Sequence, residues 1–386
     1  MPCLAQNLVR NGSFENYTPG AGGIYLEDVV HDWYAYFTTP DYFSTELWDS
    51  NLLEDYCGTL PRTGHAMAGG YQLGYFPGIP AYNREFIQGE LTEPLKANTL
   101  YYTEMYVKPM MKSPVISWAV GNLGMAFTDK HYKYIDSTDT FLIQEIPEIE
   151  YTGPAITDRS NWTKVSGCFR AQGGETKIII GNFRKDGATD TALLTGAVHH
   201  PGDYTMSYYL FDDLLVKEMP VAYIDPAEAT ICRDSTIYLK AFPEGATQYT
   251  WNTGATVNPL LVKAAGTYTV DIVTTEGCIL NAVAKVNIKF CGPECPDLYL
   301  PNAFSPNGDG RNDYFEPMNM QDITGITLSI YNRWGARVFY SSSLKGKWDG
   351  TYKALPCDVG TYQYEVRYRD CHGEAKAKKG DIALIR

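Results

Sequence analysis

Hydrophobic and polar residues alternate over short runs along most of the chain, and no segment shows the 3.6-residue spacing of a long amphipathic helix. Strict alternation places one face of a strand in a core and the other face in water. Glycine, proline and asparagine separate the runs, as they do in tight turns between strands. The pattern therefore predicts an all-β protein, with clear strands at 100–108, 177–182, 208–217, 326–331, 337–340 and 360–368.

A chain of 386 residues is too long for one ordinary core, so several domains are expected. Proline-containing stretches mark two places where one domain would end and the next begin. We predict residues 1–5 as the remnant of a secretory signal peptide, 6–219 as a jelly-roll sandwich, 220–290 as a short immunoglobulin-like sandwich, 291–296 as a linker and 297–386 as a small β-sandwich.

Acidic residues outnumber basic residues, 45 to 32, which gives a net charge of −13 and argues against nucleic acid as a partner. The charge is uneven, because residues 323–386 hold 11 Lys and Arg against 6 Asp and Glu, a net +5 that leaves −18 for the remainder. The C-terminal part is therefore a chemically separate unit. No apolar run reaches the roughly 18 residues of a membrane-spanning helix, so we expect no transmembrane segment.

Nine cysteines are scattered without a C-x-x-C pair or zinc-finger spacing, which favours an oxidising compartment over a structural zinc. Cys3 would leave with the signal peptide, so eight cysteines would remain. Trp251 lies between Cys232 and Cys278, in the order found around the inter-sheet disulfide of immunoglobulin-like sandwiches. We predict the disulfides Cys232–Cys278, Cys357–Cys371, Cys57–Cys168 and Cys291–Cys295.

Five motifs follow one another near the C-terminus: LPNAFSPNGDGRND at 300–313, YNRWG at 331–335, WDG at 348–350, GTYQY at 360–364 and KGD at 379–381. Together they closely resemble the gliding-motility-associated C-terminal domain, the type B sorting domain of the type IX secretion system of Bacteroidetes. The resemblance implies export through the periplasm to the extracellular face of the outer membrane, or secretion. It also implies partners among the type IX translocon, its associated outer-membrane proteins and a gliding adhesin.

Three groups within this domain are candidates for its recognition, and each has a structural alternative. Asn307, Asp309 and Asp313 shape a tight turn or hold a metal ion, although Arg311 stands where another oxygen ligand belongs. Arg333 and Trp334 stack at a surface, or Trp334 joins Trp348 in the core. The third group forms a solvated face or docks onto an acidic translocon surface, and it comprises Lys376, Lys378 and Lys379.

The segments Asn7–Glu15 and Tyr209–Val216 resemble the first and last strands of jelly-roll carbohydrate-binding modules of the galactose-binding-like class. Further short motifs between them resemble an N-terminal domain of surface proteins from the same bacteria. In such modules, acidic residues at these places meet at a structural Ca²⁺, which here would be held by Glu15 and Asp212, with Asp213 as the alternate. A Ca²⁺ ion would offset the repulsion between the carboxylates. The alternative is a surface or salt-bridged role.

No nucleophile-elbow, zinc-protease, P-loop or dinucleotide fingerprint is present, so we expect no enzyme activity and no required cofactor. The closely spaced Glu145, Glu148 and Glu150 fit an acidic surface better than a glycosidase pair. We predict a non-catalytic surface or secreted protein, an adhesin or an accessory component of a gliding or surface apparatus. The alternative is a secreted polysaccharide-binding module, for which the candidate stacking rings are Trp33, Tyr34, Tyr36, Tyr42, Tyr71, Tyr75 and Tyr82.

Overall fold

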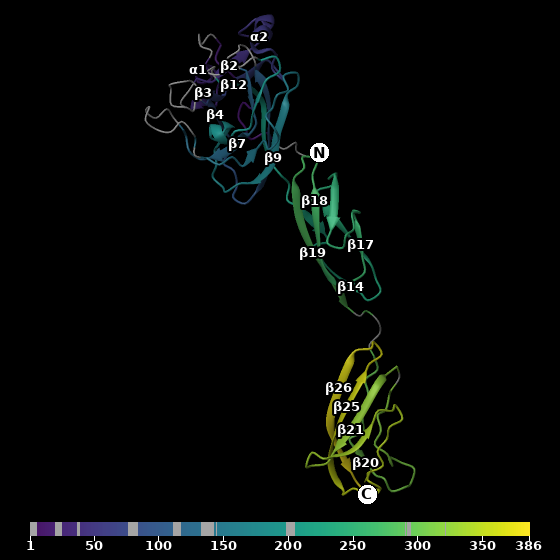
Figure 1. Cartoon of the computed structure of the whole chain (residues 1–386). Helices are drawn as coiled ribbons and strands as arrows, with labels where there is room; N and C mark the ends of the chain where they lie inside the picture. The colour runs from purple at the N-terminus through teal and green to yellow at the C-terminus, as the bar shows by residue number, and fades with distance from the viewer. Residues whose placement is uncertain are drawn as a thin grey trace. The chain divides into compact units, whose positions relative to one another are not determined.

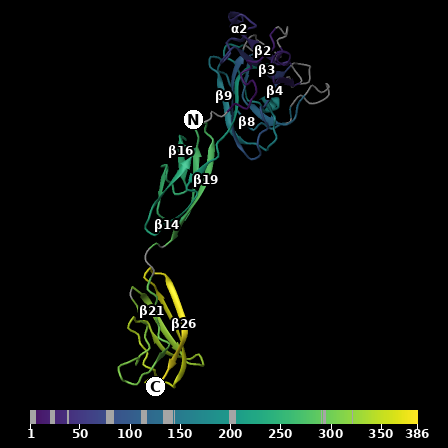
Figure 2. The ribbon, with the colours of Figure 1, turned by 180° about the vertical axis from the view of Figure 1, so that it is seen from behind.

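The structure is a computed structural model, and it describes residues 6–19, 25–36, 39–75, 84–110, 117–132, 143, 145–197, 205–289, 291, 295–320 and 322–386. Among the described residues the regular elements are almost all strands, with two short helices and one 3₁₀ turn, which confirms the predicted all-β fold (Figures 1 and 2). The predicted signal-peptide remnant, residues 1–5, lies outside the described residues. Below, the head is 6–219, the spacer is 220–290 and the C-terminal domain is 297–386.

The head is built from two five-stranded antiparallel sheets. The first sheet has the order β1 (Trp33–Tyr36), β4 (Phe86–Glu90), β10 (Lys177–Asn182), β7 (Leu123–Thr128) and β8 (Ile149–Glu150). The second has the order β2 (Asp41–Ser44), β3 (Ala66–Tyr75), β12 (Thr205–Glu218), β5 (Leu100–Met110) and β9 (Thr163–Arg170). The smaller elements are the pair β6 (Trp118–Val120) and β11 (Thr191–Leu193), α1 (Leu26–Val29), α2 (Ser50–Cys57) and a 3₁₀ turn at Asp186–Ala188.

Both faces of strand β12 are buried, which explains why its sequence is hydrophobic without alternation. Tyr209 and Phe211 face the main core between the two sheets. Their neighbours Tyr208 and Leu210 belong to a second buried cluster that includes Leu53 of helix α2. A strand covered on both sides carries a continuous apolar run, whereas a half-exposed strand alternates. The central strand of the head therefore depends on helix α2 as well as on the opposite sheet.

The spacer is a small two-sheet sandwich around a buried tryptophan. Trp251 is almost completely buried and donates its indole N–H to the carbonyl of Val257 at 2.8 Å. One sheet has the order β13 (Tyr223–Asp225), β15 (Ile237–Phe242) and β17 (Leu260–Val262). The other has the order β14 (Glu228–Cys232), β19 (Ile279–Lys289), β18 (Gly266–Val273) and β16 (Gln248–Trp251).

The C-terminal domain contains a five-stranded sheet in the order β20 (Ala303–Phe304), β26 (Ala375–Leu384), β25 (Gly360–Arg369), β21 (Thr324–Tyr331) and β22 (Arg337–Ser341). A two-stranded hairpin adds β23 (Thr351–Tyr352) and β24 (Leu355–Pro356). Trp348 is fully buried in a core with Phe304 and Phe315. The last long strand, β26, therefore completes the sheet instead of forming a loose tail.

All four predicted disulfide pairings are wrong. The predicted pairs were Cys232–Cys278, Cys357–Cys371, Cys57–Cys168 and Cys291–Cys295. The structure has Cys168–Cys278, Cys232–Cys291 and Cys295–Cys371, with Cα–Cα distances of 5.6, 5.4 and 5.7 Å. These distances lie within the usual range for disulfides. Cys57 and Cys357 are free thiols.

Strand β19 explains why the inter-sheet pairing fails. Cys278 lies directly before β19, whereas the residue after Cys232, Arg233, donates its backbone N–H to Lys289 at the far end of that strand. Eleven residues of extended strand separate the two cysteines by about 30 Å. Cys232 therefore reaches Cys291, just beyond β19, and Cys278 is left free to bridge to the head.

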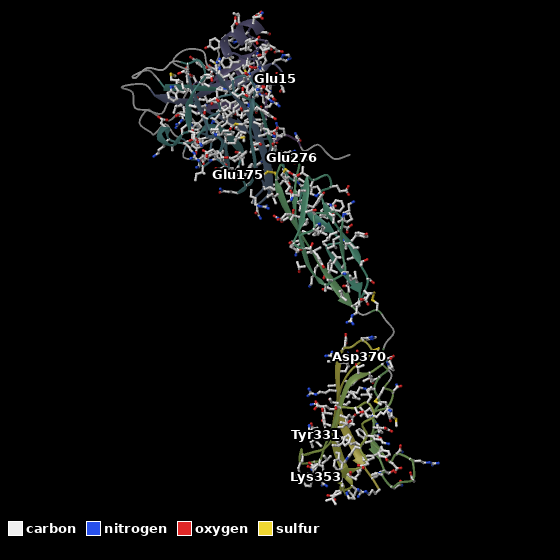
Figure 3. All side chains as sticks on the ribbon, turned by 45° about the vertical axis from the view of Figure 1, so that its right-hand side comes forward. Glu15, Glu175, Glu276, Tyr331, Lys353 and Asp370 are labelled. Carbon is white, nitrogen blue, oxygen red and sulfur yellow. A yellow bond between two sulfur atoms is a disulfide. The ribbon has the colours of Figure 1, made fainter. Side chains whose placement is uncertain are left out.

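The head and the spacer are held together by a disulfide and an ion pair. Cys168, on the edge strand β9, bonds to Cys278 in the turn between β18 and β19. Lys217 of the head lies 2.5 Å from Glu276 of the spacer, the residue labelled at this joint in Figure 3. Burial alone would raise the pKa of Glu276, but hydrogen bonds from Lys217 and Thr274 lower it to about 2. The ion pair therefore stabilises the joint above about pH 4 and is lost only as pH falls toward 2.

We expect the double variant Cys168→Ser, Cys278→Ser to loosen this joint. The bridge closes a loop with a sequence separation of 110, so its removal should cost about 4 kcal/mol through the entropy of the unfolded chain. Thermal unfolding of the full chain should begin at a lower temperature, and limited proteolysis should cut near 219–226 sooner. The control is Cys357→Ser, which removes a free thiol but no bridge. Equal melting and cleavage of both variants would show that the bridge does not hold the joint.

Candidate functional site

The three acidic residues predicted to bind calcium all contact the loop of residues 62–66. One carboxylate oxygen of Glu15 and one of Asp212 accept four backbone N–H groups of this loop and of its end at Ala66, at 2.8 to 3.3 Å. Asp213 forms an ion pair with Arg62. The loop thereby ties the opening segment of the head, at Glu15, to its last strand, β12. No motif within the loop indicates that its backbone N–H groups bind Glu15 and Asp212.

These carboxylates are already occupied by donors from the chain. Gly64 is required in the loop, because a Cβ at this position would lie 2.1 Å from an oxygen of Glu15. Burial, together with the neighbouring Asp213, raises the pKa of Asp212 to about 8. Among the residues that the structure describes, the acids do not form a group with ligand atoms within 4.8 Å of one another. A calcium ion would have to displace some of these contacts, so calcium here stays a prediction.

The turn at 307–313 is closed by its own side chains. The carboxylate of Asp313 accepts the backbone N–H groups of residues 307, 308 and 310 at 2.7 to 3.1 Å. Asp309 accepts the N–H of Arg311 at 2.7 Å and the side-chain amide of Asn307 at 3.0 Å. The oxygens that a metal would need point into the turn, which favours the structural alternative for these residues.

The predicted basic cluster on β26 is paired with carboxylates. Lys376 lies 3.0 Å from Glu374, Lys378 lies 2.7 Å from Asp297, and Lys379 lies 3.4 Å from Glu365. Exposed pairs of this kind contribute little to stability, but they neutralise the charge of the lysines. The arrangement favours a solvated face over a docking surface.

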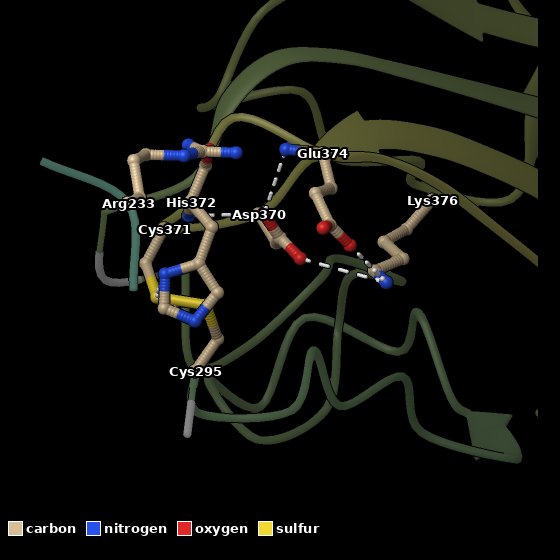
Figure 4. Close-up of a disulfide and its surroundings, with 7 residues drawn as sticks. All are labelled: Arg233, Cys295, Asp370, Cys371, His372, Glu374 and Lys376. Carbon is tan, nitrogen blue, oxygen red and sulfur yellow. Dashed lines mark hydrogen bonds and ion pairs between the residues drawn. A yellow bond between two sulfur atoms is a disulfide. The ribbon is translucent and has the colours of Figure 1, made fainter. Parts of the chain in front are cut away.

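Figure 4 shows the disulfide at the start of the C-terminal domain and its surroundings. Cys295 and Cys371 form the bond, and the imidazole Nδ1 of His372 lies 3.3 Å from the Cys371 sulfur. Asp370 accepts the backbone N–H groups of His372 and Glu374, each at 2.9 Å. Both sulfurs are committed to the bond, so this group holds the turn between β25 and β26 and offers no free thiolate ligand.

The two tryptophans of the C-terminal motifs have opposite environments. Trp348 is core, as expected, whereas Trp334 is 76% exposed, so its alternative placement in the core is wrong. The guanidinium carbon of Arg333 lies 4.8 Å from the centroid of the Trp334 ring, which confirms the stacking alternative. This pair stands on the turn between β21 and β22.

A hollow of about 240 Å³ lies beside this turn. Its lining consists of residues 332–334, Val338 and the segment 352–362 without Lys353 and Ala354. Figure 3 shows Tyr331 and Lys353 toward one end of the domain and Asp370 at the other end. Leu355 in the lining is 70% exposed and Val359 is 57% exposed. No sequence pattern marks these apolar residues, because Leu355 lies in a hairpin too short to show a period and Val359 lies in the bend after it.

Residues 298–384 match the family described as CHU_C Type IX secretion signal domain. They form a signal domain of this system, so the chain is exported to the cell surface or secreted. Among curated proteins no sequence match is found. In the described part of the chain, no helix has the length and apolar character needed to cross a membrane.

Three solved structures illustrate the range of partial similarity. The K1 cleaved adhesin domain of Lys-gingipain from Porphyromonas gingivalis W83 is 13% identical, with a TM-score of 0.27 and coverage of 54% of this chain and 96% of that chain. The CBM22-1–GH10 modules of Clostridium thermocellum xylanase 10B, complexed with xylohexaose, are 10% identical, with a TM-score of 0.27 and coverage of 56% and 33%. The adhesin domain of Epf from Streptococcus pyogenes is 9% identical, with a TM-score of 0.26 and coverage of 100% and 99%.

The raised pKa of Asp212 leads to a test of the calcium prediction. Between about pH 4 and pH 8 the folded head keeps a proton that the unfolded chain has lost, so the free energy of unfolding should fall as pH rises. We expect this fall in EDTA, measured by urea unfolding of the full chain, and we expect Asp212→Ala to abolish it. If calcium binds, millimolar Ca²⁺ should restore stability near pH 8.

The control for this test is Asp55→Ala, on the exposed face of α2, which should keep the pH dependence. Identical unfolding curves in EDTA and in Ca²⁺ at both ends of the pH range would contradict the calcium prediction. A wild-type stability that does not change with pH would contradict the protonation of Asp212.

Proposed function

We propose that this chain is a non-catalytic protein that the type IX system carries to the cell surface, where its head binds protein partners. In this proposal it serves as an adhesin or as an accessory component of a gliding or surface apparatus. The single observation that carries the proposal is the signal domain at 298–384, joined through a spacer to a separate head. The disulfide and the ion pair between head and spacer support the same role, because a partner bound to the head of a surface protein exerts force on this joint.

The surface around helix α2 supports a protein partner. Leu52 on the helix is 61% exposed, and Leu47, Tyr56 and Leu60 are exposed beside it. Exposed aliphatic and aromatic groups gathered in one place are typical of protein interaction sites. We call these four residues the α2 patch.

The candidate sugar-stacking rings give less support to the polysaccharide alternative. Trp33 and Tyr42 are core residues, and neither could stack on a sugar. Tyr34 packs edge-on against His131, and Tyr71 packs edge-on against Tyr208. Tyr82 and the side chains of Tyr36 and Tyr75 lie outside the described residues.

The acidic residues considered for glycosidase chemistry have structural partners. Glu148 accepts the backbone N–H of Phe127 at 2.9 Å, and Glu150 binds Arg184 through both carboxylate oxygens. Glu145 accepts hydrogen bonds from Lys130 and Tyr132. Three carboxylates engaged in this way support the non-catalytic role.

Deletion of residues 297–386 tests the export step. We expect the truncated chain, with Cys295→Ser to avoid an unpaired thiol, to remain in the periplasm of a gliding host, while the full chain reaches the surface or the medium. The control is a periplasmic reporter protein with and without residues 297–386 fused to its C-terminus, and only the fused form should leave the periplasm. Equal export of full and truncated chains would contradict the proposal.

The variant Leu52→Asp tests the binding role of the head. A carboxylate in the α2 patch should weaken retention of surface proteins by the immobilised full chain by about tenfold, because it places a charge in an apolar contact. The matched control is Leu261→Asp in the spacer, where the leucine is 51% exposed. Retention on insoluble polysaccharides, with no difference between the two variants, would favour the polysaccharide-binding alternative instead.

A further inference from the structure

The turn that carries Trp334 is fixed by several specific contacts, although the indole ring itself is exposed to water. The side-chain oxygen of Asn332 accepts the backbone N–H groups of Trp334 and Ala336 at 3.1 and 3.0 Å. Gly335 adopts a φ of +78°, which suits glycine above other residues. These contacts fix the backbone of the turn, yet the ring gains no burial from them. Tryptophan and arginine are both enriched among the residues that contribute most to binding at protein interfaces.

The hairpin β23–β24, which contributes Tyr352 and Leu355 to a wall of the hollow, also has an unusual backbone conformation. Lys353 and Ala354 form the two-residue turn between β23 and β24 with φ values of +51° and +63°. Asparagine and glycine are favoured at such positions, so lysine and alanine are strained there. The turn places Tyr352 and Leu355 side by side across the hairpin. Strain of this kind persists where the surrounding structure enforces it and is frequent at binding sites.

The wall is anchored to the core, so the hollow has a fixed shape. The Trp348 indole donates to the carbonyl of Thr351 at 2.9 Å. The backbone N–H of Cys357 donates to Gly350 at 2.9 Å, and the Tyr362 hydroxyl donates to the carbonyl of Asp358 at 2.8 Å. A pre-formed apolar hollow needs little reorganisation when a side chain enters it.

The charge around the hollow differs from that at the other end of the domain. Arg333, Arg337 and Lys353 stack on Trp334, Tyr340 and Tyr352 at 4.8, 4.9 and 5.3 Å from the ring centroids. Arg333 belongs to the lining, and Arg337 and Lys353 stand next to its residues Val338 and Tyr352 along the chain. Within the described residues none of these three cations has an ion pair with a carboxylate, although Asp358 contributes to the lining. The lysines of β26, at positions 376, 378 and 379, are all paired. The unpaired cations select a partner of opposite charge.

We propose that this hollow is the docking site of the C-terminal domain for an acidic protein segment with an apolar anchor side chain, presented by a protein of the export machinery. The proposal rests on the proposed function and names the surface and the chemistry that the export step uses. The anchor packs between Trp334, Tyr352 and Leu355, and the flanking carboxylates of the segment bind the guanidinium groups and Lys353. An anionic lipid headgroup would satisfy the cations but would leave the apolar hollow unfilled.

The first experiment measures export of the full chain in a gliding host. Trp334→Ala and the triple variant Arg333→Ala, Arg337→Ala, Lys353→Ala should each reduce export by about tenfold or more, because each removes a contact at the centre of the interface. The matched control, Lys376→Ala with Lys379→Ala, removes paired cations from the other end of the domain and should be exported normally. Since Trp334 is exposed, its variant should keep the melting temperature of the wild type, and this is measured in parallel.

The second experiment uses purified full-length chain and a labelled peptide in which a phenylalanine and a leucine stand among aspartates. Fluorescence polarisation should show binding that weakens with added salt and falls about tenfold in Trp334→Ala. A peptide with lysines in place of the aspartates should not bind. Binding to anionic lipid vesicles without binding to the acidic peptide would overturn the choice of a protein partner. Salt-dependent self-association abolished by Trp334→Ala would assign the hollow to a second copy and overturn it likewise.

The export role of residues 297–386 and the docking role of the hollow are contradicted by different results. If deletion of residues 297–386 leaves export intact, the proposed function itself is wrong. If that deletion blocks export but Trp334→Ala and the triple variant are exported normally, the domain is the signal and the hollow is not its docking site. Loss of export together with loss of peptide binding, at an unchanged melting temperature, is the result that the proposal requires.

Discussion

The three disulfides are the constraint on which the rest of the structure depends, because each one joins segments at a domain boundary or at a chain end of a domain. Cys168–Cys278 joins the head to the spacer, Cys232–Cys291 closes the far end of the spacer, and Cys295–Cys371 fixes the segment that enters the C-terminal domain. A spacer of this size buries little apolar surface by itself and needs covalent support. Here that support lies at its ends instead of between its sheets.

This arrangement suits a protein that folds in an oxidising compartment and works outside the cell. The Cys168–Cys278 bridge joins the head to the spacer, and the Lys217–Glu276 ion pair adds a second restraint at the same joint. The head and the C-terminal domain each have an apolar core of their own. The part of the chain that matches the type IX signal domain therefore has its own fold, apart from the head and the Cys168–Cys278 bridge that joins the head to the spacer.

Strand positions could be read from the sequence because alternation is a local property. The alternating run at 360–368 is strand β25, and the short apolar run at 177–182 is strand β10. Trp348 is buried in the core, as one of the two alternatives for this motif predicted. For these strands and for Trp348 the relevant information lies within a short stretch. The calcium candidates Glu15 and Asp212 both bind backbone N–H groups of the loop at 62–66, which the sequence did not indicate, and the calcium ion itself stays a prediction.

The features that failed depend on how distant segments meet. Disulfide pairing is decided by which ends of strands lie together, and the order of Cys232, Trp251 and Cys278 does not contain the length of β19. Trp334 and Trp348 both stand near glycines in short motifs, yet Trp348 packs on Phe304 and Tyr362 from distant strands, whereas Trp334 is exposed on a turn. The hollow was missed for the same reason, since its walls come from two turns that show no hydrophobic period.

Peptide mapping of the unreduced protein, collected from outside the cells, tests the central claim that the joints are covalently locked. After digestion without reduction, mass spectrometry should find the linked pairs Cys168–Cys278, Cys232–Cys291 and Cys295–Cys371, with Cys57 and Cys357 as free thiols. A Cys232–Cys278 link, or a link that includes Cys57 or Cys357, would contradict the account and would move the covalent support from the joints into the sandwiches.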